Sequence, residues 1–215
     1  MVMKKEELPE TIPVFPLSNF IIFPKTTVPL NIFEPRYIQM VNECMKGNRI
    51  IGMIQPKKTG SLKKPNLYEV GCAGKITSFN ETEDGRYLVI LKGICRFRII
   101  KEEKSEKLFR KCIVNFSEYY QDMEDQKEKV KFSELKLILN SLKILFEKQG
   151  YLINWSELEK KKTDQTINAL SMASPFSLEE KQVLLESKNL IIRKERFNEI
   201  LNTYIHDNFS NSTLQ

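Results

Sequence analysis

The sequence predicts an α+β chain in which a small β-barrel with one helix comes first and an α-helical bundle follows. Before Ser117, apolar and polar residues alternate with period 2 in several stretches, which is typical of strands. Beyond Ser117 the apolar residues recur at helical spacing. Charge changes at the same point, because residues 1–116 carry 20 Lys and Arg against 12 Asp and Glu, whereas residues 117–215 carry 14 against 16. We therefore expect two subdomains, 1–116 and 117–206, and a flexible polar tail, 207–215.

Seven short strands are expected before Ser117, separated by turn residues. The clearest turn is Asp84-Gly85, which predicts a hairpin between the apolar runs that end at Phe79 and begin at Tyr87. Many short strands with a single helix among them are typical of a small barrel. The expected strands are 12–15, 28–33, 49–54, 67–79, 86–92, 95–100 and 108–116.

One helix, 35–46, is expected among these strands. Pro35 suits its first turn, because the fixed φ of proline is helical and its missing N–H would have no partner there. Gly47 is expected to adopt the left-handed conformation that ends many helices. The apolar residues at helical spacing are Tyr37, Met40, Val41 and Cys44.

Helical spacing predicts five helices in the second part of the chain. The longest carries an apolar stripe that ends before Gly150. Ser156 and Ser177 are each followed three residues later by Glu, a spacing that lets the serine hydroxyl and the carboxylate cap one helix start together. The expected helices are 123–149, one from Ser156, one from Thr163 or Asp164, one from Ser177, and 190–206.

The composition excludes several classes of protein. The longest apolar runs fall short of the roughly 20 residues that a transmembrane helix needs. The N-terminus lacks the apolar segment of a secretory signal, so a cytoplasmic location is expected. The four cysteines form no C-x-x-C pair and the one histidine, His206, is far from all of them, so no metal site and no cofactor is expected. The cysteines are Cys44, Cys72, Cys95 and Cys112, which we expect to be small buried residues.

Motifs for common catalytic machinery are also missing from the sequence. There is no G-x-x-x-x-G-K-[ST] phosphate-binding loop and no G-x-S-x-G nucleophile turn. His206 is expected on a solvated helix end with no nucleophile beside it. Serine and lysine are both abundant, so counting leaves a Ser-Lys pair open, although no particular pair is indicated. No catalytic residue is therefore assigned.

A basic loop is the best candidate for contact with nucleic acid. Lys57, Lys58, Lys63 and Lys64 surround Gly60, and such a cluster could meet phosphates. The competing interpretation is an ordinary solvated loop, because few aromatic residues are interleaved with these lysines.

Two consecutive segments resemble the opening of the Lon protease N-terminal domain family. They are IPVFPLSNFIIFP, residues 12–24, and VPLNIFEPRY, residues 28–37. Further similarity follows in the same order, over residues 71–97 and again over 169–186. The resemblance implies a PUA-like β-barrel followed by a helical bundle, and a role in recognising unfolded or damaged protein. In that family the domain precedes an AAA+ ATPase and a Ser-Lys peptidase, and since this chain stops before either, we expect no enzyme activity.

The candidate binding residues are Phe20, Ile21, Ile22 and Met53. Three consecutive large apolar residues cannot all point inward from one strand, so one of the first three is expected to be exposed for binding. Met53 adds to the apolar surplus at a strand end. The expected function is a non-catalytic module that binds unfolded or exposed apolar segments of client proteins in protein quality control. Whether it acts alone or as an adaptor for a separate ATP-dependent protease is left open.

The alternative function is RNA binding through the barrel. PUA-like folds in other families hold RNA, and the first part of this chain has an excess of eight positive charges. Fold analogy alone is a weak argument. No membrane partner is expected, and the oligomeric state is left open.

Overall fold

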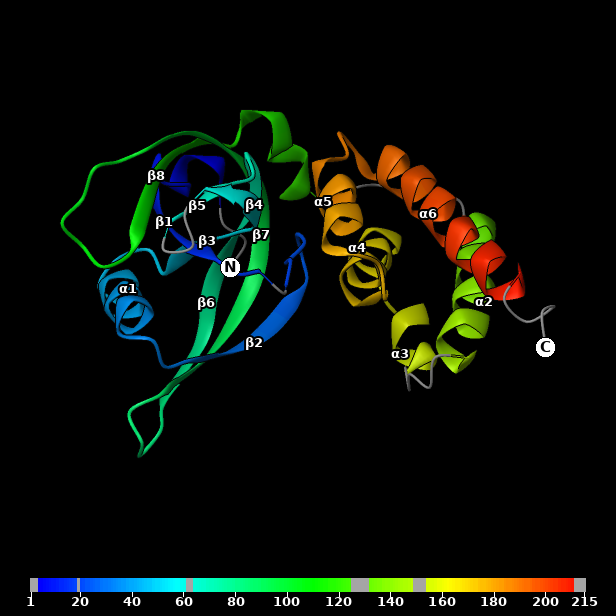
Figure 1. Cartoon of the computed structure of the whole chain (residues 1–215), viewed down its shortest axis with the longest axis horizontal. Coiled ribbons are helices and arrows are strands. Elements are labelled where there is room, and N and C mark those ends of the chain that lie inside the picture. Colours follow the sequence, from blue (N-terminus) through cyan, green and yellow to red (C-terminus); the bar gives the residue numbers. More distant parts are fainter. Residues whose placement is uncertain (1–3, 19, 61–63, 125–131, 149–153, 211–215) are drawn as a thin grey trace. The chain divides into compact units, whose positions relative to one another are not determined.

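A computed structural model of the chain describes residues 4–18, 20–60, 64–124, 132–148 and 154–210 (Figure 1). The chain divides into two compact units, Met1–Asp125 and Gln126–Gln215. Among the described residues, the first unit contains all the strands and the second contains only α-helices. The predicted boundary at residue 116 is wrong, because a short 3-10 helix, η2 (Ser117–Asp122), belongs to the first unit.

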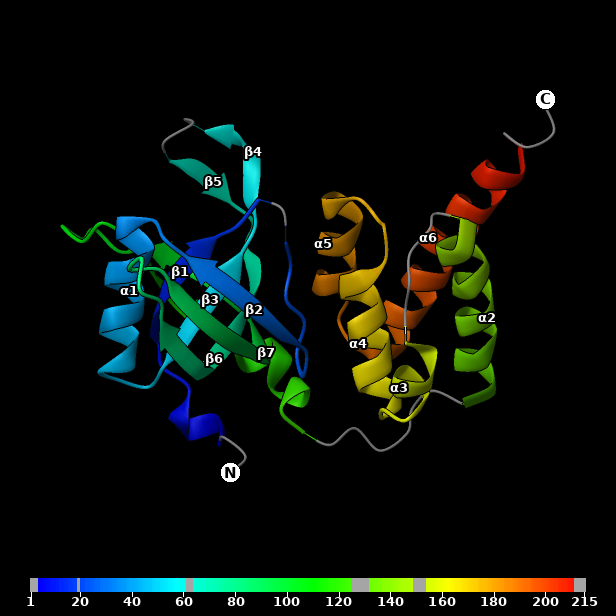
Figure 2. The same ribbon diagram turned by 90° about the horizontal axis from the view of Figure 1, so that it is seen from below.

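A closed six-stranded sheet forms the first unit, with the strand order β2-β7-β6-β3-β1-β8 and a further pairing of β7 with β8. Strands β1 and β3 are parallel, and the other pairs are antiparallel. A separate two-stranded hairpin and one helix, which contacts β1, complete the unit (Figure 2). The elements are β1 (Thr11–Pro16), β2 (Thr27–Ile32), α1 (Pro35–Met45), β3 (Ile50–Ile54), β4 (Pro56–Gly60), β5 (Pro65–Leu67), β6 (Val70–Glu81), β7 (Tyr87–Glu102) and β8 (Arg110–Asn115), preceded by a 3-10 turn, η1 (Lys5–Glu7).

Strand β7 is continuous over the two strands expected at 86–92 and 95–100. Its first half pairs with β2 and its second half with β8, so one strand closes the sheet. Gly93 lies where the partner changes. A Cβ there would stand 2.2 Å from the carbonyl oxygen of Phe23, so the glycine permits a close approach of the chain rather than a turn.

The two glycine turns expected from the sequence have different outcomes. Gly85 has φ of 78° in the turn between β6 and β7, which confirms the predicted hairpin. Gly47 does not adopt the left-handed conformation, so that prediction is wrong. The reversal comes later, at Arg49, whose φ is 61° and whose N–H donates to the carbonyl of Cys44 at 3.1 Å. Arg49, and not Gly47, therefore adopts the left-handed conformation, which is unfavourable for a residue with a side chain.

The second unit consists of α2 (Phe132–Lys148), α3 (Trp155–Glu159), α4 (Thr163–Ala173), α5 (Leu178–Glu186) and α6 (Leu190–Ser210). Helix α6 contacts α2, α4 and α5, and their apolar faces meet in a buried core. The Ser177 cap is confirmed, since its hydroxyl accepts from the N–H of Glu180 and its own N–H donates to the Glu180 carboxylate. The Ser156 cap is wrong, because Asn154 accepts the N–H of Glu157 instead.

Two expected boundaries in this unit also change. The long helix is described over Phe132–Lys148. Met123, where it was expected to begin, is not helical, and residues 125–131 lie outside the described part of the chain. Helix α6 continues to Ser210, so the first residues of the expected tail are helical. The last five residues, 211–215, are not among those described.

Candidate functional site

Three of the four predicted binding residues are buried. Ile21, Ile22 and Met53 are 5%, 1% and 3% exposed, and Phe20 is the one that is partly exposed. Residues 20–26 are irregular and not a strand, so the alternation of inward and outward side chains does not apply to them. Met53 lies in β3, between β1 and β6, where every residue is buried. The expectation of an exposed apolar surplus is therefore corrected at Ile21, Ile22 and Met53.

A tight turn fixes the chain just before β2. The buried hydroxyl of Thr26 donates to the carbonyl of Phe23 at 2.6 Å and accepts the Phe23 N–H at 3.2 Å. Lys25 has φ of 63°, and its N–H donates to the carbonyl of Gly93. Because these buried polar groups are all satisfied, the segment is part of the scaffold that holds β2 against β7.

An exposed apolar surface lies instead on β2 and β7, and we call it the apolar face: Pro29, Phe33, Leu88 and Ile90. The strand register places Pro29 opposite Ile90 and Asn31 opposite Leu88. Leu88 and Ile90 are 45% and 40% exposed, and Phe33, which follows β2, is 62% exposed. Figure 2 shows β2, β7 and β6 as neighbours in the sheet.

Alternation along β7 explains why these side chains are exposed. Tyr87, Val89 and Leu91 point into the core and are buried, so Leu88 and Ile90 must point outward. The same argument that singled out residues 20–22 applies to the five consecutive apolar residues 87–91. Applied to residues 87–91, which form a strand, that argument predicts that some of their apolar side chains are exposed.

The hairpin between β6 and β7 borders the apolar face and extends beyond the rest of the sheet (Figure 1). Arg86 lies 5.9 Å from the centre of the Phe33 ring and pairs with Asp84 at 3.0 Å. A hydrogen bond from the Thr82 hydroxyl lowers the pKa of Asp84, which keeps this carboxyl ionised. An open hollow of about 650 Å³ lies here, lined by Asn31, Asn80, Glu81, Thr82, Glu83, Asp84, Arg86 and Leu88.

A second hollow, of about 410 Å³, lies between the β4–β5 hairpin, the start of α1 and β8. Arg110 binds both carboxylate oxygens of Glu102, at 3.1 and 2.7 Å, and also donates to the carbonyl of Pro65. Arg36, at the start of α1, pairs with Glu34 at 2.7 Å. Both guanidinium charges around this hollow are thus matched by carboxylates.

The predicted basic loop is this β4–β5 hairpin. Lys57 lies 5.6 Å from the Tyr68 ring centre, and Lys64 pairs with Glu102 at 2.9 Å. Lys63 falls outside the described residues. Lys58 is exposed, but the ion pair of Lys64 reduces the positive charge that the hairpin presents to phosphates.

The cysteines and His206 are placed as the sequence predicts. All four thiols are free and buried, and burial raises the pKa of Cys44 to about 12 and that of Cys112 to about 11. Such thiols stay protonated and are poor nucleophiles. His206 is exposed on α6. In the described part of the chain, no cluster of three or more His, Cys, Asp and Glu side chains could hold a metal ion, and no helix could span a membrane.

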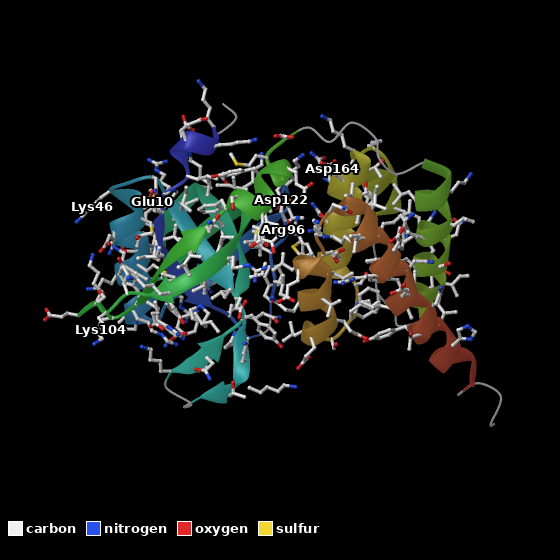
Figure 3. The ribbon with its side chains drawn as sticks, turned by 90° about the horizontal axis from the view of Figure 1, so that it is seen from above. Glu10, Lys46, Arg96, Lys104, Asp122 and Asp164 are labelled. Atoms are coloured by element: carbon white, nitrogen blue, oxygen red, sulfur yellow. The ribbon has the colours of Figure 1, made fainter. Side chains whose placement is uncertain are left out.

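A buried ion pair that the sequence analysis missed joins β7 to η2. Arg96 and Asp122 lie next to each other in Figure 3. The Arg96 guanidinium donates to both carboxylate oxygens of Asp122 at 2.8 Å, and the Arg96 backbone N–H donates to the same carboxylate at 3.1 Å. The Tyr119 ring centre lies 4.3 Å from the guanidinium carbon. No local pattern links two residues this far apart in sequence.

Comparison with known proteins gives consistent matches over nearly the whole chain. A family model described as the ATP-dependent protease La (LON) substrate-binding domain matches residues 11–203. The chain is 27% identical to the Lon protease of Desulfosudis oleivorans, covering 92% of this chain and 24% of that protein. It is 29% identical to the Lon protease of Flavobacterium johnsoniae, covering 93% of this chain and 24% of that protein. The chain thus spans about a quarter of the length of these curated relatives.

Two solved structures have the same fold. One is the Lon N-terminal domain protein from Xanthomonas campestris, with a TM-score of 0.63 and 19% identity over 89% of this chain and 97% of that one. The other is the N-terminal domain of the Mycobacterium avium complex Lon protease, with a TM-score of 0.59 and 15% identity over 90% of this chain and 97% of that one. The α+β architecture expected from the sequence is confirmed.

Proposed function

Because this chain belongs to the family of LON substrate-binding domains, we propose that it is a non-catalytic module that binds unfolded or exposed apolar segments of client proteins. The observation that carries the proposal is the apolar face, where three large apolar side chains are exposed on β7 and directly after β2. Exposed apolar patches on an otherwise polar surface commonly mark contact sites for other proteins.

The size of the apolar face sets the expected strength of binding. Fully burying a Leu, Ile or Phe side chain stabilises a complex by about 1.5–3 kcal/mol. Ordering a flexible client offsets much of the gain from three such residues. We therefore expect weak and reversible binding, which suits a module that samples many clients.

The proposal also includes one further contact residue, a partner and a cellular location. Phe20 is partly exposed and stays a proposed secondary contact. Transfer of clients to a separate ATP-dependent protease, and a cytoplasmic location, are proposed on the family relationship. We do not extend the proposal to RNA, because the charges of the β4–β5 hairpin are partly neutralised.

The test compares binding of one model client in its native form and in its reduced, unfolded form. Leu88→Ser combined with Ile90→Ser should weaken binding of the unfolded form at least tenfold, because both exposed apolar contacts are lost. Leu108→Ser is the matched control, since Leu108 is an exposed leucine of the same unit outside the apolar face. Equal binding of the native and unfolded forms, or an unchanged affinity of the double variant, would overturn the proposal.

A further inference from the structure

The apolar face carries opposite charges at its two ends. At one end the registers of β2, β7 and β6 align Thr27, Lys92 and Lys75 in one row. Lys92 is exposed and Lys75 is half-buried, and neither pairs with a described carboxylate. We call Lys75 and Lys92 the lysine end.

The other end lies at the turn between β6 and β7. Glu81, Glu83 and Asp84 are all exposed there, and Arg86 is the cation among them. Three carboxylates against one guanidinium leave this end negative. We call these four residues the hairpin end.

The distance between the ends suits a short extended peptide. Lys92 lies six positions after Arg86, the residue that directly precedes β7, and Leu88 and Ile90 lie between them. At roughly 3.3 Å per residue the two ends are about 20 Å apart. A client segment of about six residues in extended conformation would reach from one to the other.

The free edge of β2 is poorly suited to strand addition. The N–H of Gly93 donates to the carbonyl of Thr26, so alternation of the ladder directs the backbone of Thr27, Pro29 and Asn31 toward the edge. Proline has no N–H, so the middle of this edge lacks a donor. A client is therefore expected to contact the side chains of the face and not to extend the sheet.

Resting on the function proposed above, we propose that the apolar face selects extended client segments with apolar residues at the centre, an acidic residue at one end and a basic residue at the other. The acidic residue lies at the lysine end and the basic residue at the hairpin end. Exposed ion pairs are individually weak and screened by salt. The selectivity is therefore a few-fold and electrostatic, added to an affinity that comes from apolar contact.

The experiment uses the full chain and two synthetic peptides with the same apolar centre. One peptide carries Glu at one end and Lys at the other, and the second carries Lys at both ends. At low salt the wild-type protein should bind the first peptide about three to ten times more tightly, and the difference should vanish at high salt. Lys75→Glu combined with Lys92→Glu should reverse the preference.

A matched charge control separates local from global electrostatics. Lys101→Glu combined with Lys104→Glu changes the net charge by the same amount at two exposed positions away from the apolar face, and should keep the wild-type preference. If Lys75→Glu disturbs folding, Lys92→Glu alone should still reduce the preference. An unchanged preference in folded lysine-end variants, or the same loss in the control, would overturn the inference.

Failure of the charge selection can be distinguished from failure of the proposed function. If Leu88→Ser with Ile90→Ser abolishes binding of both peptides while the lysine-end variants change nothing, the apolar face binds clients without charge selection. If that serine variant binds both peptides like the wild type, the proposed function itself fails.

Discussion

Arg96 and Asp122 enclose one positive and one negative charge in the interior of the first unit, with side chains 1% and 4% exposed. Removing a charge from water is costly, and the pair is tolerated because each group compensates the other through short, well-aligned hydrogen bonds. Their mutual contact holds η2 against β7. Together with the Arg98–Glu118 pair it links η2 to the first unit, which extends beyond residue 116.

Asp122→Asn is expected to destabilise the first unit by about 3–5 kcal/mol, because it leaves the Arg96 charge buried without its counter-charge. Urea unfolding measures the change. Glu118→Gln is the matched control, since Glu118 lies on the same short helix and pairs with Arg98, also of β7, but at the surface. That control should change stability by less than about 1 kcal/mol. Equal effects of the two substitutions would contradict this account of the pair.

At the scale of the element, β7 determines how the barrel closes. It pairs with β2 and then with β8, and Gly93 lets the chain at Phe23 approach its backbone at the point of change. From sequence alone Gly93 looked like a break between two strands, because a glycine at a turn and a glycine at a close contact look alike. The residue that requires it, Phe23, is seventy positions away.

Gly93→Ala is expected to destabilise the first unit by about 1–3 kcal/mol, since the added methyl group must displace the Phe23 backbone. Thermal unfolding measures the effect. Gly47→Ala is the control, because a methyl group there meets nothing nearer than 3.9 Å and φ is not positive. It should be neutral or slightly stabilising. A neutral Gly93→Ala would show that the contact can relax at little cost.

The ion pairs of Glu102 with Arg110 and with Lys64, in the β4–β5 hairpin, should make the stability of the first unit sensitive to acid. Burial alone would raise the pKa of Glu102, but hydrogen bonds from Arg110 and Lys64 lower it below its usual value. The ion pairs of Glu102 therefore stabilise the folded state fully above the pKa of an unfolded Glu, about 4.3. This stabilisation is lost as the pH falls through the lower pKa that Glu102 has in the folded state.

Glu102→Gln should flatten the loss of stability between about pH 5 and pH 3, because the variant has no carboxylate to protonate. Urea unfolding at a series of pH values measures the slope. Glu106→Gln is the control, since Glu106 is exposed, and it should leave the slope as in the wild type. A Glu102→Gln slope identical to that of the wild type would show that the ion pairs of Glu102 add nothing to stability.

At the scale of the whole molecule, periodicity was enough to predict a strand-rich part followed by a helical part. It could not separate exposed from buried apolar runs, because exposure depends on whether the backbone is a strand. Ile21 and Ile22 lie in an irregular segment that folds inward, whereas Leu88 and Ile90 lie in a strand whose other face fills the core. The alternation argument applied to residues 20–22 therefore holds for residues 87–91, where the chain is a strand.

Methyl-resolved NMR of the full chain tests most directly whether clients bind the apolar face. Titration with a reduced, unfolded client should shift or broaden the methyl signals of Leu88 and Ile90. Leu137 and Ile144, which are exposed on α2 and have the same side-chain types, should remain unchanged. Perturbation of Leu137 and Ile144 with Leu88 and Ile90 unaffected would contradict the claim.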